Sequence, residues 1–197
     1  AEVIQNNVYS RGVTTNILSN EKLIGASRYP DATWQSMAVY LNDEYDLSEK
    51  FVMQAGIRYN LFALNADFSD NTDFYPFPFA EAQINNGALT GSIGGVYRPT
   101  DSWVIKTNFG TAFRSPNVDD IGKVFDSEPG AVVVPNSDLK AEYAYNIDLG
   151  VAKVIAERVK MDVTGYYTIL ENALVRRDFQ LNEKDSIFYD GSLSQVQ

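Results

Sequence analysis

Hydrophobic and polar residues alternate with a period of two along several long stretches of the chain. Within 51–59 one face carries Phe51, Met53, Ala55, Ile57 and Tyr59, and the other carries Val52, Gln54, Gly56 and Arg58. The stretches 103–113, 143–151 and 159–169 alternate in the same way, and their charged residues fall almost wholly on the second face. A period of two predicts β-strands that each have one apolar and one polar face.

The alternating stretches predict about eight strands, joined by connections of two kinds. The expected strands are 1–9, 33–45, 51–66, 88–98, 103–113, 139–153, 159–177 and one that begins near 187. Short connections (46–50, 99–102 and 154–158) alternate with long ones (10–31, 67–86, 114–138 and 178–186). The pattern predicts an all-β, antiparallel up-and-down meander. Regular alternation of short turns and long loops is typical of outer-membrane barrels, whereas the connections of a soluble sandwich have no reason to alternate so regularly.

Aromatic residues flank two of the short turns. Tyr45 and Phe51 enclose the first turn, and Tyr97 and Trp103 enclose the second. Such pairs predict an aromatic girdle at a membrane interface, although the third turn lacks them. Asp43 lies on the apolar face close to Tyr45, where an interfacial carboxylate costs about 0–1 kcal/mol. The same marks also fit an ordinary antiparallel sheet with one wet face.

Composition removes several classes of function. The net charge of −10 argues against nucleic acid as a partner, because phosphate binding needs a basic surface. The chain has neither His nor Cys, so Ser-His catalysis, zinc sites of the usual kind and the common haem ligands are excluded. A carboxylate-only enzyme stays formally possible, but most of the 26 acidic residues fall in turns and loops. We predict no catalytic residues, no metal site and no cofactor.

Two motifs around the third long loop resemble a known family. Phe113–Asn117 reads Phe-Arg-Ser-Pro-Asn, and Pro135–Glu142 reads Pro-Asn-Ser-Asp-Leu-Lys-Ala-Glu. They resemble the boxes that flank a long extracellular loop in the barrel of TonB-dependent outer-membrane receptors, with Ser137 and Ala141 in place of the usual prolines. Three further stretches, 54–59, 94–99 and 146–150, are similar to recurrent strand motifs of the family. Two others, 74–79 and 119–125, look like versions found in Bacteroidetes-type receptors.

The resemblance implies a barrel of about 22 strands filled by an N-terminal plug. Residues 1–197 are then expected to be about a third of such a barrel, without the plug and without the box for the energy-coupling partner. The implied function is active uptake across the outer membrane of a scarce nutrient such as a ferric chelate. The implied partners are outer-membrane lipid, a small-molecule ligand and, through the missing plug, the inner-membrane TonB complex. A passive porin-like channel and a soluble antiparallel β-sheet binding module are the alternatives.

Three loop residues are candidates for ligand contact: Tyr75, Phe77 and Arg114. Residues 74–79 place four aromatics in an exposed loop, and we expect them to cap the barrel mouth rather than to bind ligand. Arg114 follows a strand end, where its guanidinium can fork onto carboxylates and pin the loop. Because the chain has no His, we also expect it to supply no axial ligand to haem, and we expect ferric chelates rather than haem for the receptor.

Overall fold

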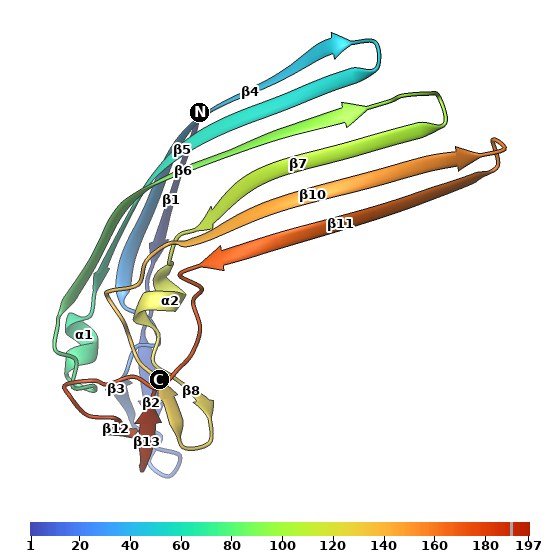
Figure 1. The fold of residues 1–197 in the computed structure, drawn as a ribbon. Helices are drawn as coiled ribbons and strands as arrows, with labels where there is room; N and C mark the ends of the chain where they lie inside the picture. Colours follow the sequence, from blue (N-terminus) through green and yellow to red (C-terminus); the bar gives the residue numbers. More distant parts are fainter. Residues whose placement is uncertain (190) are drawn as a thin grey trace.

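The computed structural model describes residues 1–189 and 191–197, and only the backbone of 125–127. It consists of a long sheet and a cluster of loops at one end of that sheet (Figure 1). Seven antiparallel strands form the long sheet in the order β1 (Glu2–Val8), β4 (Asp31–Ser48), β5 (Phe51–Asp67), β6 (Glu81–Tyr97), β7 (Trp103–Arg114), β10 (Glu142–Ile155) and β11 (Val159–Glu171). The predicted meander is therefore confirmed, and it is open, with β1 and β11 at its edges.

The long sheet divides toward the loop cluster. Strands β5 and β6 pair along their whole length, from Phe51 opposite Tyr97 to Asp67 opposite Glu81. Strands β6 and β7 pair only as far as Ser92 opposite Gly110. Beyond that point β4, β5 and β6 bend away and run into the loop cluster, while β7, β10 and β11 end at the bend (Figure 1).

Two strand boundaries differ most from the sequence-based prediction. Strand β6 begins at Glu81 rather than near residue 88, so the loop before it is shorter and holds helix α1 (Ser69–Thr72). Within the longer strand Gly87 leaves room for Tyr59, because a Cβ at Gly87 would meet the Tyr59 hydroxyl. Strand β11 ends at Glu171 rather than at 177, because Asn172 has a φ of 53° and leaves the extended conformation.

The long connections contain more regular structure than predicted. The first holds a hairpin, and the third holds a helix and two short strands. These elements are β2 (Gly12–Thr15), β3 (Lys22–Gly25), α2 (Val118–Gly122), β8 (Phe125–Glu128) and β9 (Ala131–Val133). None of the helices in the described part of the chain is long and apolar enough to cross a membrane.

The eighth predicted strand does not join the long sheet. Residues from 186 onward form β12 (Ser186–Tyr189) and β13 (Ser192–Val196), which pair with each other. Residue 190, inside the predicted strand, lies outside the described residues. β13 also pairs in parallel with β9, giving a small sheet in the order β12-β13-β9-β8. Strands this short cannot span a bilayer, which takes about 9–11 residues.

The buried core lies under the loops. We call the face of the long sheet that α2 covers the inward face, and the opposite one the outward face. On the inward face Leu64, Ala66 and Ile84 are buried against Val118 and Ile121 of α2. A second cluster joins the small sheet through Val124, Val132, Val134, Leu181, Ile187 and Val196.

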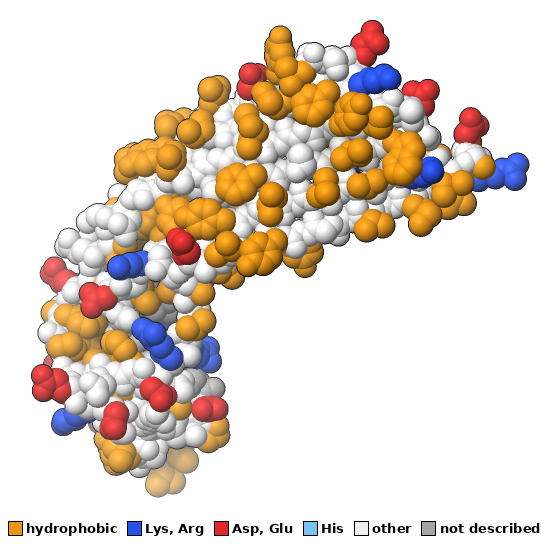
Figure 2. Space-filling view, in the orientation of Figure 1, with side chains coloured by type: hydrophobic (Ala, Val, Ile, Leu, Met, Phe, Trp, Pro, Cys, Tyr) orange, Lys and Arg blue, Asp and Glu red, His pale blue; other side chains and the backbone are white. Residues whose placement is uncertain are grey.

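No other described segment of the chain covers the outward face. Its apolar side chains are mostly exposed, among them Met37, Val39, Leu41, Ile57, Leu61, Leu89, Ile93, Ile147, Leu149 and Val163. Figure 2 shows hydrophobic side chains spread over the long sheet, with charged ones gathered at its turn end and around the loop cluster. An apolar surface of this extent requires a partner other than water.

Candidate functional site: the loop cluster

Arg114, one of the predicted site residues, stands where the sheet meets the loop cluster. It is the last residue of β7, and its guanidinium forks between two carboxylates. One nitrogen lies 2.6 Å from Asp120 of α2, and the other lies 2.9 Å from Glu142 at the start of β10. As predicted, the guanidinium pins the long loop. Both carboxylates are largely shielded, with 17% of each side chain exposed, so these ion pairs are less screened than fully exposed ones.

The same carboxylates hold two other segments. Asp120 accepts a hydrogen bond from the backbone of Asn117, whose side chain in turn caps α2. This reciprocal capping box satisfies backbone N–H groups that the first turn of a helix leaves unpaired. The other oxygen of Glu142 accepts a 2.8 Å hydrogen bond from the backbone N–H of Leu174. Arg114, Asp120, Glu142 and Leu174 therefore form one connected latch between α2, β10 and the segment after β11.

A cleft of about 610 Å³ lies beside the latch. Its walls come from α2, β9 and the segments 136–140 and 172–179, and they include Arg114, Asp120, Lys140, Leu174 and Phe179. Basic, acidic and apolar groups thus line one open space. Of the predicted ligand-contact residues, Arg114 borders this cleft, whereas Tyr75 and Phe77 are not among its lining residues.

Three of the four aromatics at 74–79, namely Tyr75, Phe77 and Phe79, pack inside the loop cluster, whereas Phe74 is 43% exposed. Phe77 stacks on Phe79 with ring centroids 5.9 Å apart, and both rings meet the fully buried Phe68 edge-on. Tyr75 stacks on Tyr189 of the small sheet at 6.2 Å. Phe77 contacts both buried clusters, so these rings join the small sheet to the long one.

Two further ion pairs lie in the loop cluster. Arg11 binds Asp31 through two hydrogen bonds of 2.8 and 3.0 Å and ties the β2–β3 hairpin to β4. In α2, Asp119 lies 3.1 Å from Lys123. Burial opposes ionisation of Asp119, but hydrogen bonds from Lys123 and Tyr29 outweigh it, so the pKa of this carboxyl is lowered. Within the described residues no group of three or more acidic side chains could hold a metal ion.

The four girdle aromatics lie at the opposite end of the sheet. Phe51 is the cross-strand partner of Tyr97, with ring centroids 6.3 Å apart. Lys153 places its ammonium 4.5 Å from the ring of Trp103, and Tyr45 is 60% exposed. This arrangement puts amphipathic rings at the edge of the apolar surface. Their role at a membrane interface remains a prediction.

Sequence reasoning missed residues whose signal was present. The latch carboxylate Asp120 lies in the family-like stretch 119–125, and Glu142 ends the motif that begins at Pro135. Only the structure shows that both reach Arg114. The buried residues Phe62, Leu64 and Ala66 continue the even-numbered positions of β5, which are polar nearer the turn. The large apolar residues of β5 shift from odd-numbered to even-numbered positions along the strand, and this shift could have revealed them.

Comparison with known proteins agrees with this architecture. Residues 4–184 match the family model described as TonB dependent receptor-like, beta-barrel. No curated protein sequence matches the chain. Among solved structures, the copper transporter OprC is similar with a TM-score of 0.68 at 14% identity, covering 90% of this chain and 26% of that one.

Two further solved structures share the fold. The hemophore receptor HasR of Serratia marcescens, solved with its hemophore and heme, has a TM-score of 0.60 at 14% identity, covering 74% of this chain and 26% of that one. The iron transporter FrpB of Neisseria meningitidis has a TM-score of 0.52 at 17% identity, covering 74% and 19%. This chain thus spans about a quarter of their length or less. With the family model matched over nearly the whole meander, the chain belongs to the TonB-dependent receptor β-barrel family.

Proposed function

We propose that this chain forms part of the wall and outer loops of an outer-membrane receptor that actively takes up a scarce nutrient such as a ferric chelate. The observation that carries the proposal is the uncovered apolar band on the outward face of the long sheet. On β5 the band runs from Phe51 to Leu61, between the aromatic end and a polar stretch that includes Asn65.

The height of the band supports a position in a bilayer. The ten residue steps from Phe51 to Leu61 cover about 33 Å along the strand at about 3.3 Å each. A strand tilt of about 40° reduces this to a height of about 25 Å, which is the thickness of the apolar band on outer-membrane barrels.

The inward face near the turns supports a polar interior. Arg58 pairs with Glu2 at 3.3 Å and lies over the ring of Tyr40. Asn108 and Asn146 both donate hydrogen bonds to Asp148. Such a surface fits a lumen filled by water or by a plug domain. Coupling to the inner-membrane TonB complex would pass through that plug, and the ligand would be a small molecule captured by loops and plug.

Within the loop cluster we assign Tyr75 and Phe77 to capping the barrel mouth and Arg114 to holding the loops. The stacking that joins the two buried clusters supports capping. Tyr75→Ala and Phe77→Ala in the complete receptor are expected to lower thermal stability and leave ligand affinity and uptake unchanged. A loss of affinity at full stability would assign these rings to ligand contact instead.

A ferric chelate is preferred to haem because this chain contains no His. Titrating haem into the complete receptor should give no ligated Soret spectrum that depends on a tyrosine of this chain. A sharp spectrum abolished by Tyr143→Phe or Tyr145→Phe would contradict this assignment.

Uptake measurements test the proposed function directly. Cells that carry the complete receptor should accumulate a radiolabelled ferric chelate, and a protonophore that discharges the inner membrane should stop accumulation. Uptake that only equilibrates, regardless of the protonophore, would indicate the porin-like alternative. A protein that is monodisperse in water without detergent would indicate the soluble binding module.

Sidedness is tested by labelling in intact cells. We expect Asp70→Cys and Glu128→Cys, in the long loops, to react with a membrane-impermeant maleimide, and Ser48→Cys, in a short turn, to stay unlabelled. Labelling of Ser48→Cys alone would reverse the orientation.

A further inference from the structure

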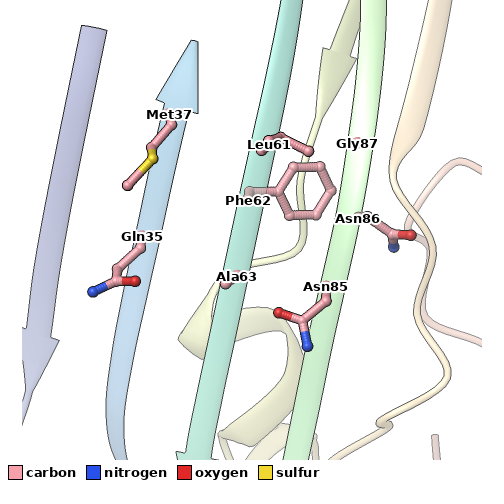
Figure 3. A pocket seen from close by; sticks show the side chains of 8 residues that line it. All are labelled: Gln35, Met37, Leu61, Phe62, Ala63, Asn85, Asn86 and Gly87. Carbon is pink, nitrogen blue, oxygen red and sulfur yellow. The ribbon is translucent and has the colours of Figure 1, made fainter.

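A shallow groove lies on the outward face where the apolar band ends. Its volume is about 430 Å³, and its outward-facing lining comes from Gln35, Met37, Leu61, Ala63, Asn85 and Gly87. Figure 3 shows Gln35 and Met37 on β4 and Asn85 on β6, with Leu61 and Ala63 of β5 between them. The groove exists because Ala63 and Gly87 are small, and its lining is apolar on one side and amide on the other.

At the end of the apolar band, the strands β1, β4, β5 and β6 align their outward-facing residues in rows across the sheet. The row Val3–Met37–Leu61–Gly87 is followed by Gln5–Gln35–Ala63–Asn85, then by Asn7–Thr33–Asn65–Gln83, and last by Asp31–Asp67–Glu81. The outward face therefore changes from apolar to neutral amide to carboxylate within four rows. A second hollow, of about 350 Å³, lies in the last two rows and is lined in part by Thr33, Asn65, Asp67, Glu81 and Gln83.

The amide rows present hydrogen-bonding groups to whatever occupies the hollows. Toward β1 the polar side chains of these rows are held by hydrogen bonds within the chain. Gln35 donates to Gln5 at 3.1 Å, and Thr33 donates to Asn7 at 3.2 Å. On β6, Gln83 and Asn85 are exposed and make no side-chain hydrogen bond to any described residue. The free amide of Asn85 borders the first hollow, and that of Gln83 borders the second.

Charge restricts the class of ligand. No position of the four rows is Lys or Arg, and the last row carries three carboxylates. Arg11, which reaches Asp31, is already engaged by it. A phosphate placed here would meet acceptors and negative charge, whereas sugar hydroxyls can donate to the carboxylates and exchange hydrogen bonds with the amides. An acyl chain finds Met37 and Leu61, each about half exposed, directly below.

We propose that these two hollows bind a glycolipid of the outer leaflet whose sugar headgroup is uncharged. The acyl chain lies along Met37 and Leu61, and the headgroup lies against the amide and carboxylate rows. The inference rests on the proposed outer-membrane location and adds to it a specific lipid site on the strands β4, β5 and β6.

Native mass spectrometry of the complete receptor, released from nanodiscs, tests the site. The probes are digalactosyldiacylglycerol, which has a neutral sugar headgroup, and phosphatidylglycerol, which is anionic. We expect the wild-type receptor to retain the glycolipid at concentrations about tenfold lower than phosphatidylglycerol. Ala63→Leu fills the groove and Asn85→Leu removes a free amide, so each should weaken glycolipid retention about tenfold. Ala55→Leu, on the same face of β5 within the apolar band, is the matched control and should change nothing.

The outcomes separate this inference from the proposed function. A membrane-bound receptor that retains both lipids equally, prefers phosphatidylglycerol, or is unaffected by Ala63→Leu and Asn85→Leu would overturn the site and leave the receptor function standing. A protein that needs no detergent and binds neither lipid would overturn both. Selective loss of the glycolipid in the two groove variants, with Ala55→Leu unchanged, supports the site.

Discussion

The two halves of β5 place their apolar residues on opposite faces. Toward the turn, Met53, Ile57 and Leu61 point outward and are exposed or half-buried, while the inward positions from Gln54 to Asn60 carry no large apolar side chain. Toward the loops, Leu64 and Ala66 point inward and are buried, while Asn65 faces outward. One continuous strand, without a break in its pairing with β6, therefore changes its apolar side just beyond Leu61.

This reversal matches the surroundings that we propose for each half. In the loop half the inward side is protein core and the outward side suits water, as in a soluble sheet. In the turn half the inward side is polar and the outward side is apolar, which suits a bilayer around a polar lumen. Because the register is continuous, only a change of surroundings along the strand accounts for the reversal.

The strongest test of the comparison uses two leucines three positions apart. Leu64→Ala removes a fully buried side chain and leaves a cavity, which should cost about 2–5 kcal/mol of folding free energy. Leu61→Ala, on the exposed outward face, should cost much less in detergent, since detergent fills the space. Thermal unfolding of the complete receptor, with hydrogen exchange in residues 114–142, measures both. Equal losses would mean that the two halves do not differ as described.

The next test places a charge on each face of the turn half. Ile57→Lys puts an ammonium near the middle of the outward band, at an expected cost of about 2–4 kcal/mol in a bilayer. Gln54→Lys, on the inward face, should be tolerated, because Gln54 already contacts the carboxylate of Glu44. Folding yield into lipid vesicles measures the difference. A well-tolerated Ile57→Lys would show that the outward face does not meet lipid.

The sequence predicts the turn half far better than the loop half. Period-two alternation and the aromatics Phe51 and Tyr97 place the central hairpins correctly, because strand register there depends on local pattern and turn length. The loop cluster depends on contacts between distant segments. β13 pairs with β9 about sixty residues earlier, which no local pattern encodes.

The candidate site divides in the same way. The position of Arg114 beyond a strand end predicts that it binds carboxylates, and the structure supplies Asp120 and Glu142. The sequence does not predict the hydrogen bond from Leu174 to Glu142, because its pattern continues the strand through residues 172–177. Their departure from the sheet depends on the left-handed backbone at Asn172.

Removing the latch tests whether charge, beside packing, holds the loop half together. Arg114→Gln loses both ion pairs and should cost about 1 kcal/mol, since nearly half of the Arg114 side chain is exposed. Hydrogen exchange should rise in residues 172–177, which the latch holds through Glu142, and stay constant in β5. Arg114→Lys keeps the charge but loses the fork, so it should recover only part of the protection. Unchanged exchange at 172–177 in Arg114→Gln would show that packing alone fixes this segment.

The smallest expected effect is a pH dependence of α2 in the loop half. The pKa of Asp119 is lowered below its ordinary value of 3.8, so its stabilising contribution is complete above about pH 4 and disappears as the pH falls through the lower folded-state pKa. With 55% of the Asp119 side chain exposed, the contribution should stay below about 1 kcal/mol and decrease in high salt. Intrinsic-rate-corrected hydrogen exchange in α2 should therefore be constant from pH 8 to 5 and rise below pH 4. Asp119→Asn removes this titration, and comparison with it isolates Asp119 from the other carboxylates of the cluster. If both proteins lose protection equally below pH 4, the pair with Lys123 does not stabilise the helix, and packing of Val118 and Ile121 against β5 holds it in place.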